Sequence, residues 1–192
     1  MKDIIENIFQ ESVRVKEQFI KENYNDLITL ARKIASAFTR DRKLMLCGNG
    51  GSAADAQHIA AEFVNRLEME RPPLPAISLA TDSSIITCIG NDYSFNDIFT
   101  KQVKAIGLEG DVLLAISTSG NSQNVISAAE TASEMGIYVA ALTGGKGGKL
   151  KDVSDLCLIV PSESTARTQE SHILAGHIIC KLVDHILFQG GE

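Results

Sequence analysis

Residues 44–52 read Leu-Met-Leu-Cys-Gly-Asn-Gly-Gly-Ser, and residues 112–122 read Val-Leu-Leu-Ala-Ile-Ser-Thr-Ser-Gly-Asn-Ser. Each stretch is a short apolar run that ends in a turn rich in glycine and serine and leads into a helical pattern. Backbone N–H groups freed by glycine, short hydroxyl side chains and the dipole of the following helix together favour a bound anion. A tight reversal after a strand is the better explanation of one such turn alone. Two in one chain indicate a pocket for the phosphate of a small molecule.

Apolar runs of strand length recur from residue 43 onward, with helical patterns between most of them. They cover Leu44–Cys47, Ala76–Leu79, Val112–Ile116, Tyr138–Leu142 and Leu156–Val160. Continuous apolar runs are typical of strands covered on both faces, and parallel neighbours require crossover helices. The pattern predicts an α/β fold with a doubly wound, largely parallel five-stranded sheet. Ligands of such sheets bind at the carboxyl ends of the strands, where both serine-bearing turns fall.

The first forty residues contain neither glycine nor proline and carry apolar residues at helical spacing. The pattern predicts a helical hairpin over residues 1–40, formed by two helices broken near Asn23, ahead of an α/β core over residues 41–192. No change of composition marks a linker, so the 192 residues are expected to form a single domain. The apolar stripes of the hairpin must be buried either across the core of the same chain or against another subunit. We favour the subunit contact.

The composition disfavours some classes of partner. Of the 192 residues, 44% are hydrophobic and 22% are charged, which suits one compact domain with a substantial core. A formal net charge of −6 and a pI near 5.3 argue against a general nucleic-acid or anionic-membrane surface. The chain opens without an apolar signal core, and no stretch approaches the roughly 20 apolar residues of a membrane span. We therefore expect a soluble, cytoplasmic protein whose four cysteines are reduced.

His58 and Glu62 lie four positions apart in the helical pattern after the first turn, so their side chains share one face. Such a pair can ligate a divalent metal, or the glutamate can act as a base beside the histidine. The structural alternative is an exposed helix pair that contributes only a few tenths of a kcal/mol. The small and apolar neighbours of the pair favour a chemical role.

The last helical pattern, over residues 165–187, contains three histidines on or beside an apolar stripe. A histidine in that setting is usually a hydrogen-bonded core residue, which is the prediction for His172 and His185. Gln169 and His177 are eight positions apart, about 12 Å along a straight helix. One small ligand would not easily touch both from one chain. If both are functional, they serve a site shared between subunits or approach it from opposite ends.

Together these residues resemble the sugar isomerase (SIS) family, and within it the phosphoheptose isomerases that act on sedoheptulose 7-phosphate. The resemblance covers nearly the whole chain. It rests on Cys47–His58, Glu62, Asn65-Arg66, Gly90–Asp92, Asn96-Asp97, Gly110–Ser122, Leu142–Gly144, Thr165–Leu174 and His177. The Ser-Thr-Ser-Gly-Asn-Ser turn alone is typical of phosphosugar-binding SIS domains in general. Four residues narrow the resemblance to the heptose enzymes: His58, Glu62, Gln169 and His177.

The resemblance implies a single SIS domain with a flavodoxin-like sheet, assembled as a cytoplasmic homotetramer with active sites at subunit interfaces. The implied reaction converts sedoheptulose 7-phosphate to D-glycero-D-manno-heptose 7-phosphate for bacterial surface glycans such as lipopolysaccharide. The implied phosphate ligands are Ser117, Thr118, Ser119 and Ser122. The other implied substrate contacts are Asn49, Gly50, Gly51, Ser52, Glu62, Asn91, Asp92 and Gln169. Zinc, one ion per subunit, is implied at His58, Glu62, Gln169 and His177.

An aldose–ketose isomerisation moves a proton between adjacent carbons through an enediol or enediolate, so it needs a base and a proton carrier for the oxygens. Glu62 is predicted to be the base, in a partly desolvated pocket. His177 is predicted to carry protons between the oxygens or to assist ring opening. A bound zinc ion would polarise the carbonyl and stabilise the enediolate. The sequence leaves open whether Glu62 is base, metal ligand or both.

Two non-catalytic roles compete with the isomerase. One is a silent phosphosugar-sensing SIS module, which the lack of an attached DNA-binding segment disfavours. The other is a scaffold resembling a close relative that binds the bacterial replication initiator and shares a stretch like residues 65–72. That relative lacks the glutamate and the final histidine, so the presence of Glu62 and His177 favours the isomerase.

Overall fold

The computed structural model describes residues 1–190. Its helices are α1 (Lys2–Phe38), α2 (Gly51–Val64), α3 (Ser83–Asp92), α4 (Thr100–Ile106), α5 (Gln123–Glu134) and α6 (Thr165–Phe188), with short 3-10 helices η1 (Phe95–Asp97) and η2 (Lys149–Val153). Its strands are β1 (Leu44–Gly48), β2 (Ala76–Ser78), β3 (Val112–Ser117), β4 (Tyr138–Gly144) and β5 (Leu156–Val160). The strands form one parallel sheet of order β2-β1-β3-β4-β5. The predicted doubly wound sheet is confirmed, since every predicted strand is present.

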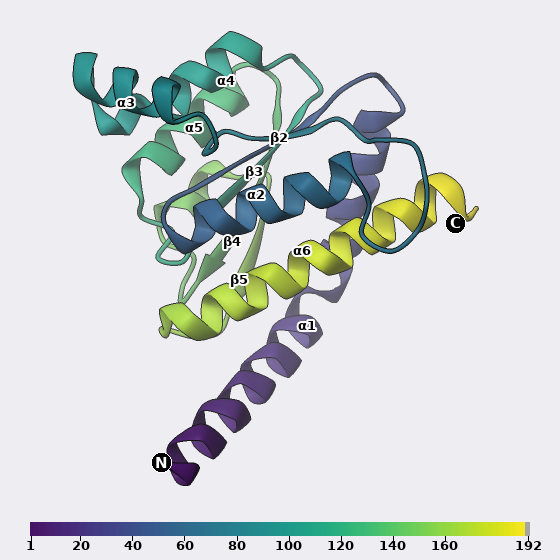
Figure 1. Ribbon diagram of the computed structural model, residues 1–192, viewed down its shortest axis with the longest axis vertical. Coiled ribbons are helices and arrows are strands. Elements are labelled where there is room, and N and C mark those ends of the chain that lie inside the picture. The colour runs from purple at the N-terminus through teal and green to yellow at the C-terminus, as the bar shows by residue number, and fades with distance from the viewer. Residues whose placement is uncertain (191–192) are drawn as a thin grey trace.

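Helices cover both faces of this sheet (Figure 1). Successive residues of a strand point to opposite faces, and each face packs on its own set of helices. Leu44 and Leu46 belong to the core cluster formed with α1, α2 and α6, whereas Met45 between them belongs to the cluster formed with α4 and α5. Because both faces are covered, β1 and β3 are buried along their whole length, which explains their continuous apolar sequence.

The N-terminal segment forms one continuous helix, so the predicted helical hairpin over residues 1–40 is wrong. Helix α1 runs for 37 residues, and Asn23 lies inside it. The Asn23 side chain is buried, and its Nδ2 donates to the Phe19 carbonyl at 2.9 Å. The same amide pairs with the backbone N–H and carbonyl of Ile159 in β5, at 3.3 and 3.4 Å. A polar residue that resembled a helix break is therefore a tertiary contact, and α1 contains no glycine or proline to end it.

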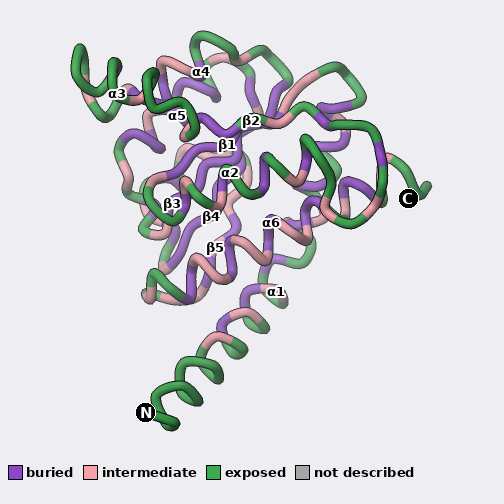
Figure 2. The backbone as a smooth tube through the Cα atoms, in the orientation of Figure 1, coloured by how far each residue is buried: buried purple, intermediate pink, exposed green. Residues whose placement is uncertain are grey.

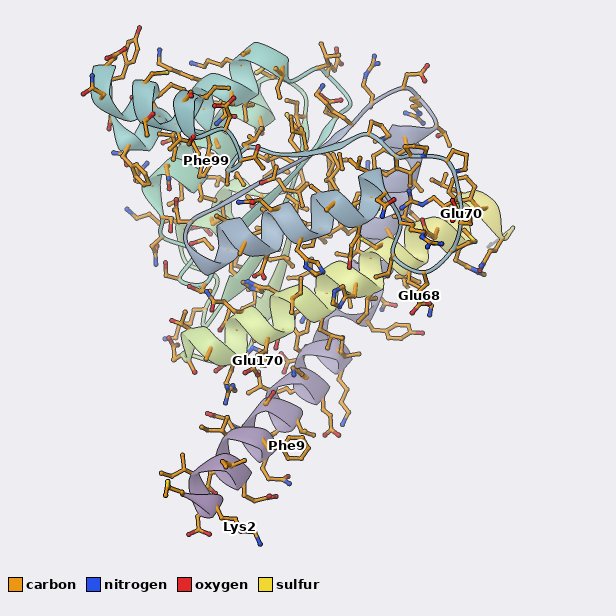
Figure 3. The ribbon with its side chains drawn as sticks, in the orientation of Figure 1. Lys2, Phe9, Glu68, Glu70, Phe99 and Glu170 are labelled. Carbon is orange, nitrogen blue, oxygen red and sulfur yellow. The ribbon has the colours of Figure 1, made fainter. Side chains whose placement is uncertain are left out.

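The first turns of α1 extend beyond the α/β body (Figures 1 and 2). Their apolar side chains are exposed: Ile4 by 61%, Ile5 by 70%, Ile8 by 49% and Phe9 by 58%. Phe9 stands out from α1 in Figure 3. The core of the same chain does not cover these apolar residues of α1. Their burial against another subunit therefore stays a prediction.

Two charged residues of α6 attach α1 to the body. Arg167 donates to the Ile8 carbonyl at 3.1 Å, and the Ser12 hydroxyl donates to the Glu170 carboxylate at 2.6 Å. Glu170 lies where α6 passes α1 in Figure 3. These bonds fix the direction of α1 relative to α6, the helix that also carries His177.

Helix α6 is the segment of residues 1–190 whose length and apolar composition would permit a membrane span. Within its most apolar window 44% of the residues are buried. The helix packs against α1 and α2, and it contributes Ala175, Ile179 and Val183 to the core. These are the features of a core helix in a globular domain.

Candidate active site

The two serine-bearing turns lie side by side at the carboxyl edge of the sheet, as predicted. Strands β1 and β3 are neighbours, with Gly48 opposite Ile116. The side-chain amides of Asn49 and Asn124 donate to one another, both at 2.9 Å, which joins the first turn to the helix after the second. One edge of the sheet therefore carries both turns together with the starts of α2 and α5.

The second turn, residues 117–122, presents its hydroxyls at the start of α5. Ser117 is buried, and its Oγ lies 3.0 Å from the Oγ of Ser122, the residue that precedes α5. Thr118 is half-buried and Ser119 is exposed. Hydroxyl donors at the N-terminus of a helix of 12 residues favour a phosphate group. The geometry suits the phosphate role predicted for these four residues.

The first turn, residues 48–52, contains one glycine that the backbone conformation requires and another that makes room for a side chain. Gly50 has φ = +54°, a left-handed conformation that side chains rarely adopt. A Cβ on Gly51 would overlap the side-chain amide of Gln169, near the start of α6. Gln169 therefore lies over the start of α2, while Ser52 is buried in the first turn of that helix.

A cavity of about 340 Å³ opens between the second turn and the loops that follow β4 and β5. Its lining consists of Thr118, Ser119, Asn121, Gly144, Gly145, Lys146, Gly148, Ser162, Glu163, Thr165 and Thr168. Ligand pockets commonly span about 300 to 1,000 Å³, so a small phosphorylated molecule fits this volume. A larger cavity, of about 580 Å³, is lined from the opposite edge of the sheet and contains none of the predicted site residues.

Three of the predicted metal and catalytic residues meet between α2 and α6. His58 Nε2 and His177 Nε2 lie 3.0 and 3.3 Å from Glu62 Oε1, and 3.2 Å from each other. The Glu62 side chain is 12% exposed, and its Oε2 is buried without a hydrogen-bond partner among residues 1–190. Ligand atoms of the three residues lie within 4.8 Å of one another, and two imidazoles with a carboxylate form a donor set that zinc accepts. His58 and Glu62 are therefore more than an exposed helix pair, because His177 joins them and the Glu62 carboxylate is largely buried.

Helices α2 and α6 lie side by side and run in the same direction (Figure 1). Gly176 permits this approach, since a Cβ there would lie 2.6 Å from both Cγ1 and Cδ1 of the buried Ile59. His58 and His177 are the sequence neighbours of these two residues. The close contact of the helices therefore brings the two imidazole rings together, with centroids 5.3 Å apart.

A buried arginine that the sequence analysis did not select holds the end of α2. Arg71 Nη2 donates to the Glu62 carbonyl at 2.9 Å, and Nη1 donates to the Phe63 carbonyl at 2.6 Å. Arg71 Nε donates to Asp184 of α6 at 2.9 Å, and the two side chains are only 1% and 8% exposed. Arg71 thus satisfies the last carbonyls of α2 and ties the backbone of Glu62 to α6. Arginine is seldom buried, so nothing in the sequence indicated that Arg71 would be a buried structural residue.

Cys180 packs beside Glu62 from α6. Burial raises the pKa of the Cys180 thiol, and the neighbouring Glu62 carboxylate raises it further. The thiol therefore stays protonated, which gives the carboxylate a neutral neighbour. All four cysteines of the chain are free.

The fourth predicted metal ligand, Gln169, lies at the start of α2 and not in this cluster. Eight positions along α6 separate it from His177, about 12 Å along the axis. Glu62 in turn lies about 16 Å along α2 from Gly51 and the first turn. A seven-carbon sugar phosphate is roughly 10 Å long when extended, at about 1.3 Å per bond. Measured along the axes of α2 and α6, the cluster and the first turn are therefore separated by slightly more than the length of one such molecule.

Asn91 and Asp92 lie at the exposed end of α3, where the Asn91 amide donates to Asp92 at 2.8 Å. Helix α3 lies well away from the point where α2 and α6 meet (Figure 1). A single chain therefore does not bring these two residues to the cluster of Glu62.

The two histidines predicted to be core residues differ in the structure. His172 is buried with Nε2 3.1 Å from the Thr143 carbonyl, and burial lowers its pKa to about 4, so the prediction is confirmed. His185 is exposed and pairs with Gln189 at 3.0 Å, so the prediction is wrong. The apolar stripe of α6 faces away from His185. Because the stripe is wide, helical periodicity alone did not show whether His185 lies inside it or beside it.

A family profile and two similar proteins relate this chain to the same family. The profile of the SIS domain family matches residues 8–144. A phosphoheptose isomerase from Nitratidesulfovibrio vulgaris Hildenborough is 54% identical over 179 residues, covering 93% of this chain and 86% of the relative. A phosphoheptose isomerase from Thermodesulfovibrio yellowstonii is 52% identical over 189 residues, covering 98% of this chain and 94% of the relative.

Solved structures of phosphoheptose isomerases have the same fold as this chain. The phosphoheptose isomerase GmhA from Neisseria gonorrhoeae superimposes with a TM-score of 0.90 at 45% identity, covering 95% of this chain and 98% of that one. A phosphoheptose isomerase from Francisella tularensis superimposes with a TM-score of 0.89 at 42% identity, covering 95% and 97%. The family profile spans most of the chain, and the relatives share about half of their residues with it over nearly its full length. The chain belongs to the SIS domain family and, within it, to the phosphoheptose isomerases.

Proposed function

We propose that this protein is an aldose–ketose isomerase that converts sedoheptulose 7-phosphate to D-glycero-D-manno-heptose 7-phosphate. The cluster of Glu62 with His58 and His177 carries the proposal, because it places a largely buried carboxylate beside two proton carriers. The hydroxyl-rich turn over residues 117–122 supplies the phosphate ligands. A silent sugar-binding module would need the turn but not the cluster, and a scaffold would need neither feature. The product feeds a bacterial surface glycan, and the enzyme works in the cytoplasm.

Glu62 is the proposed base. Its Oε1 removes a proton from C1 of the ketose and returns one to C2, while a proton leaves the oxygen on C1 and another joins the oxygen on C2. His177, with Nε2 3.3 Å from that Oε1, carries protons between the two sugar oxygens. The second oxygen of the carboxylate is buried, so Oε1 is the atom available for this chemistry.

The same cluster fits a zinc ion, one per subunit, held by His58, Glu62 and His177. Gln169 would complete the set only from another subunit, because it lies at the start of α2 in its own chain. When bound, the metal would polarise the carbonyl and stabilise the enediolate. Glu62 Oε1 serves either the metal or the proton, so the two roles compete for one atom.

His58→Ala is expected to remove most of the bound zinc, because it deletes one of three ligands while leaving Glu62 and the turns in place. Metal content per chain after equilibration with zinc and gel filtration, measured by plasma mass spectrometry, checks this. His185→Ala is the matched control, since His185 is exposed outside the cluster. Equal zinc in wild type and His58→Ala would argue against this metal site.

The protein works as a homotetramer with active sites at subunit interfaces. Two observations support this assembly. Glu62 lies about 16 Å along α2 from the turn that begins this helix, which is more than the length of one substrate, and the exposed apolar turns of α1 offer a surface for association. In the assembled enzyme the phosphate loop of one subunit faces Glu62 and His177 of another.

The double variant Ile5→Asp with Phe9→Asp is expected to dissociate the tetramer and remove more than nine-tenths of the turnover, because charges replace the apolar contact. Light scattering coupled to gel filtration gives the mass, and Lys2→Asp is the control on the same segment. A double variant that stays tetrameric would contradict the role of this part of α1.

Gly176→Ala is expected to lower turnover about tenfold or more, because the added methyl group meets Ile59, separates α2 from α6 and displaces His177 from Glu62. Overpacking of this kind also costs about 1–3 kcal/mol of stability. Thermal melts and steady-state kinetics measure both effects. Gly90→Ala is the control for stability, since a Cβ there meets nothing within 4 Å. If Gly176→Ala matches wild type in both, the close contact does not set the position of His177.

The proposed function is tested by incubating the purified protein with sedoheptulose 7-phosphate and following formation of the aldose by NMR. The same reaction with a chelator present reports whether metal is needed. Absence of any aldose, with and without added zinc, would reject the proposed function.

A further inference from the structure

The loop after β4 places a lysine at the cavity beside the second turn. Residues 144–148 read Gly-Gly-Lys-Gly-Gly, and Lys146 lines the cavity of about 340 Å³ together with Thr118 and Ser119. Among the lining residues one other carries a charge, Glu163. Lys146 is not among the site residues predicted from the sequence.

The backbone of this loop is closely defined. Gly145, Gly147 and Gly148 have φ values of +62°, +94° and +58°. The Gly144 N–H donates to the Thr118 carbonyl at 3.0 Å, which ties the loop directly to the second turn. Between these left-handed glycines, position 146 is the one that carries a side chain, and the fixed backbone sets the point from which that side chain reaches the cavity.

Lys146 is the one cation among the residues that line the cavity. Lys146 forms no ion pair among residues 1–190. Glu163 lies against the loop backbone instead, with its carboxylate oxygens 2.9 and 3.1 Å from where a Cβ of Gly145 would stand. The hydroxyls and backbone N–H groups of the second turn are neutral donors. A cation in the lining therefore favours a phosphate that enters beside Glu163 in a chain of net charge −6, and Lys146 is the cation there.

We propose that Lys146 is a substrate-binding residue, which pairs with the phosphate held by the second turn and offsets the charge of Glu163. This inference rests on the proposed function, since it assigns a partner to the phosphate of the same substrate. An ammonium on a flexible four-carbon stem acts as a point charge that follows the phosphate as it enters. Because the phosphate is remote from the reacting carbons, the effect falls on binding and not on the proton transfer.

Lys146→Met keeps most of the stem and removes the charge. It is expected to raise KM for sedoheptulose 7-phosphate about tenfold, the loss typical of one charge-assisted hydrogen bond, with kcat changed less than about twofold. Lys149→Met is the matched control, because Lys149 follows the same loop but lies outside the cavity lining. Glu163→Gln added to Lys146→Met is expected to lower KM again, since it removes the uncompensated negative charge.

An unchanged KM in Lys146→Met, or an equal rise in Lys149→Met, would overturn the inference. Calorimetric binding of inorganic phosphate supplies a measurement that does not depend on turnover. Wild type is expected to bind phosphate about tenfold more tightly than Lys146→Met, with a steeper loss of affinity as salt is added. Equal affinities would overturn the role of Lys146 even in an active enzyme. A wild type that binds phosphate but forms no aldose would reject the proposed function alone.

Discussion

Glu62→Gln is expected to lower kcat for sedoheptulose 7-phosphate by about a thousandfold, within the range that general base catalysis contributes. The amide has nearly the shape of the carboxylate, but it does not accept a proton at neutral pH. Oε1 of Glu62 is the atom that faces both His58 and His177, at 3.0 and 3.3 Å, and Oε2 is buried. The substitution therefore removes the proton acceptor while the pocket keeps its volume.

Binding of the phosphosugar is expected to persist in this variant, because the ligands of the phosphate lie in the second turn. Calorimetry measures the affinity, and NMR of the reaction mixture measures turnover. Loss of kcat with retained affinity is the signature of an interaction made in the transition state. Glu68→Gln is the control, since Glu68 lies in the exposed loop after α2 and pairs with Lys181 at 2.7 Å (Figure 3). Full turnover in Glu62→Gln would refute the base assignment.

Arg71→Met is expected to destabilise the fold by about 3–5 kcal/mol, the usual result of removing one partner of a buried ion pair. The substitution leaves Asp184 charged and buried, removes the Arg71 donor of the Glu62 carbonyl, and leaves the Phe63 carbonyl with the Leu74 N–H alone. The end of α2 is then free to move away from α6, so turnover is expected to fall together with stability.

Equilibrium denaturation at fixed protein concentration measures this change, because association also contributes to the stability of an oligomer. The double variant Arg71→Met with Asp184→Leu is expected to recover much of the loss, since it removes the unpaired charge. Arg66→Met is the surface control. Arg66 pairs with the exposed Glu70, so its loss is expected to cost less than about 1 kcal/mol. Similar losses in Arg66→Met and Arg71→Met would contradict the buried capping role.

Local patterns accounted for most of the fold. The apolar run from Leu44 and the run from Val112 identified strands buried on both faces, because a strand covered by helices has no polar face. The glycines after those runs marked the carboxyl edge of the sheet, where β1 and β3 do lie side by side. The positions of both turns followed from sequence because their geometry depends on near neighbours in the chain.

Features that depend on distant partners did not follow from sequence. Asn23 resembled a break, and only its pairing with Ile159 explains why the helix continues through it. Arg71 and Lys146 were not predicted. The buried position of Arg71 and the cavity that Lys146 lines are both formed by segments far apart in the sequence. The separation of Gln169 from His177 was foreseen, since it needs only the rise of 1.5 Å per residue along one helix.

The contact between Asn23 and Ile159 also bears on how the protein resists aggregation. Strand β5 ends one side of the sheet, and the Asn23 amide occupies outward-facing backbone groups there while α1 packs along the strand. On the other side the terminal strand, β2, is only 3 residues long. A strand from a second molecule thus meets no long row of vacant donors and acceptors in the described chain, so the sheet is a poor template for fibril growth.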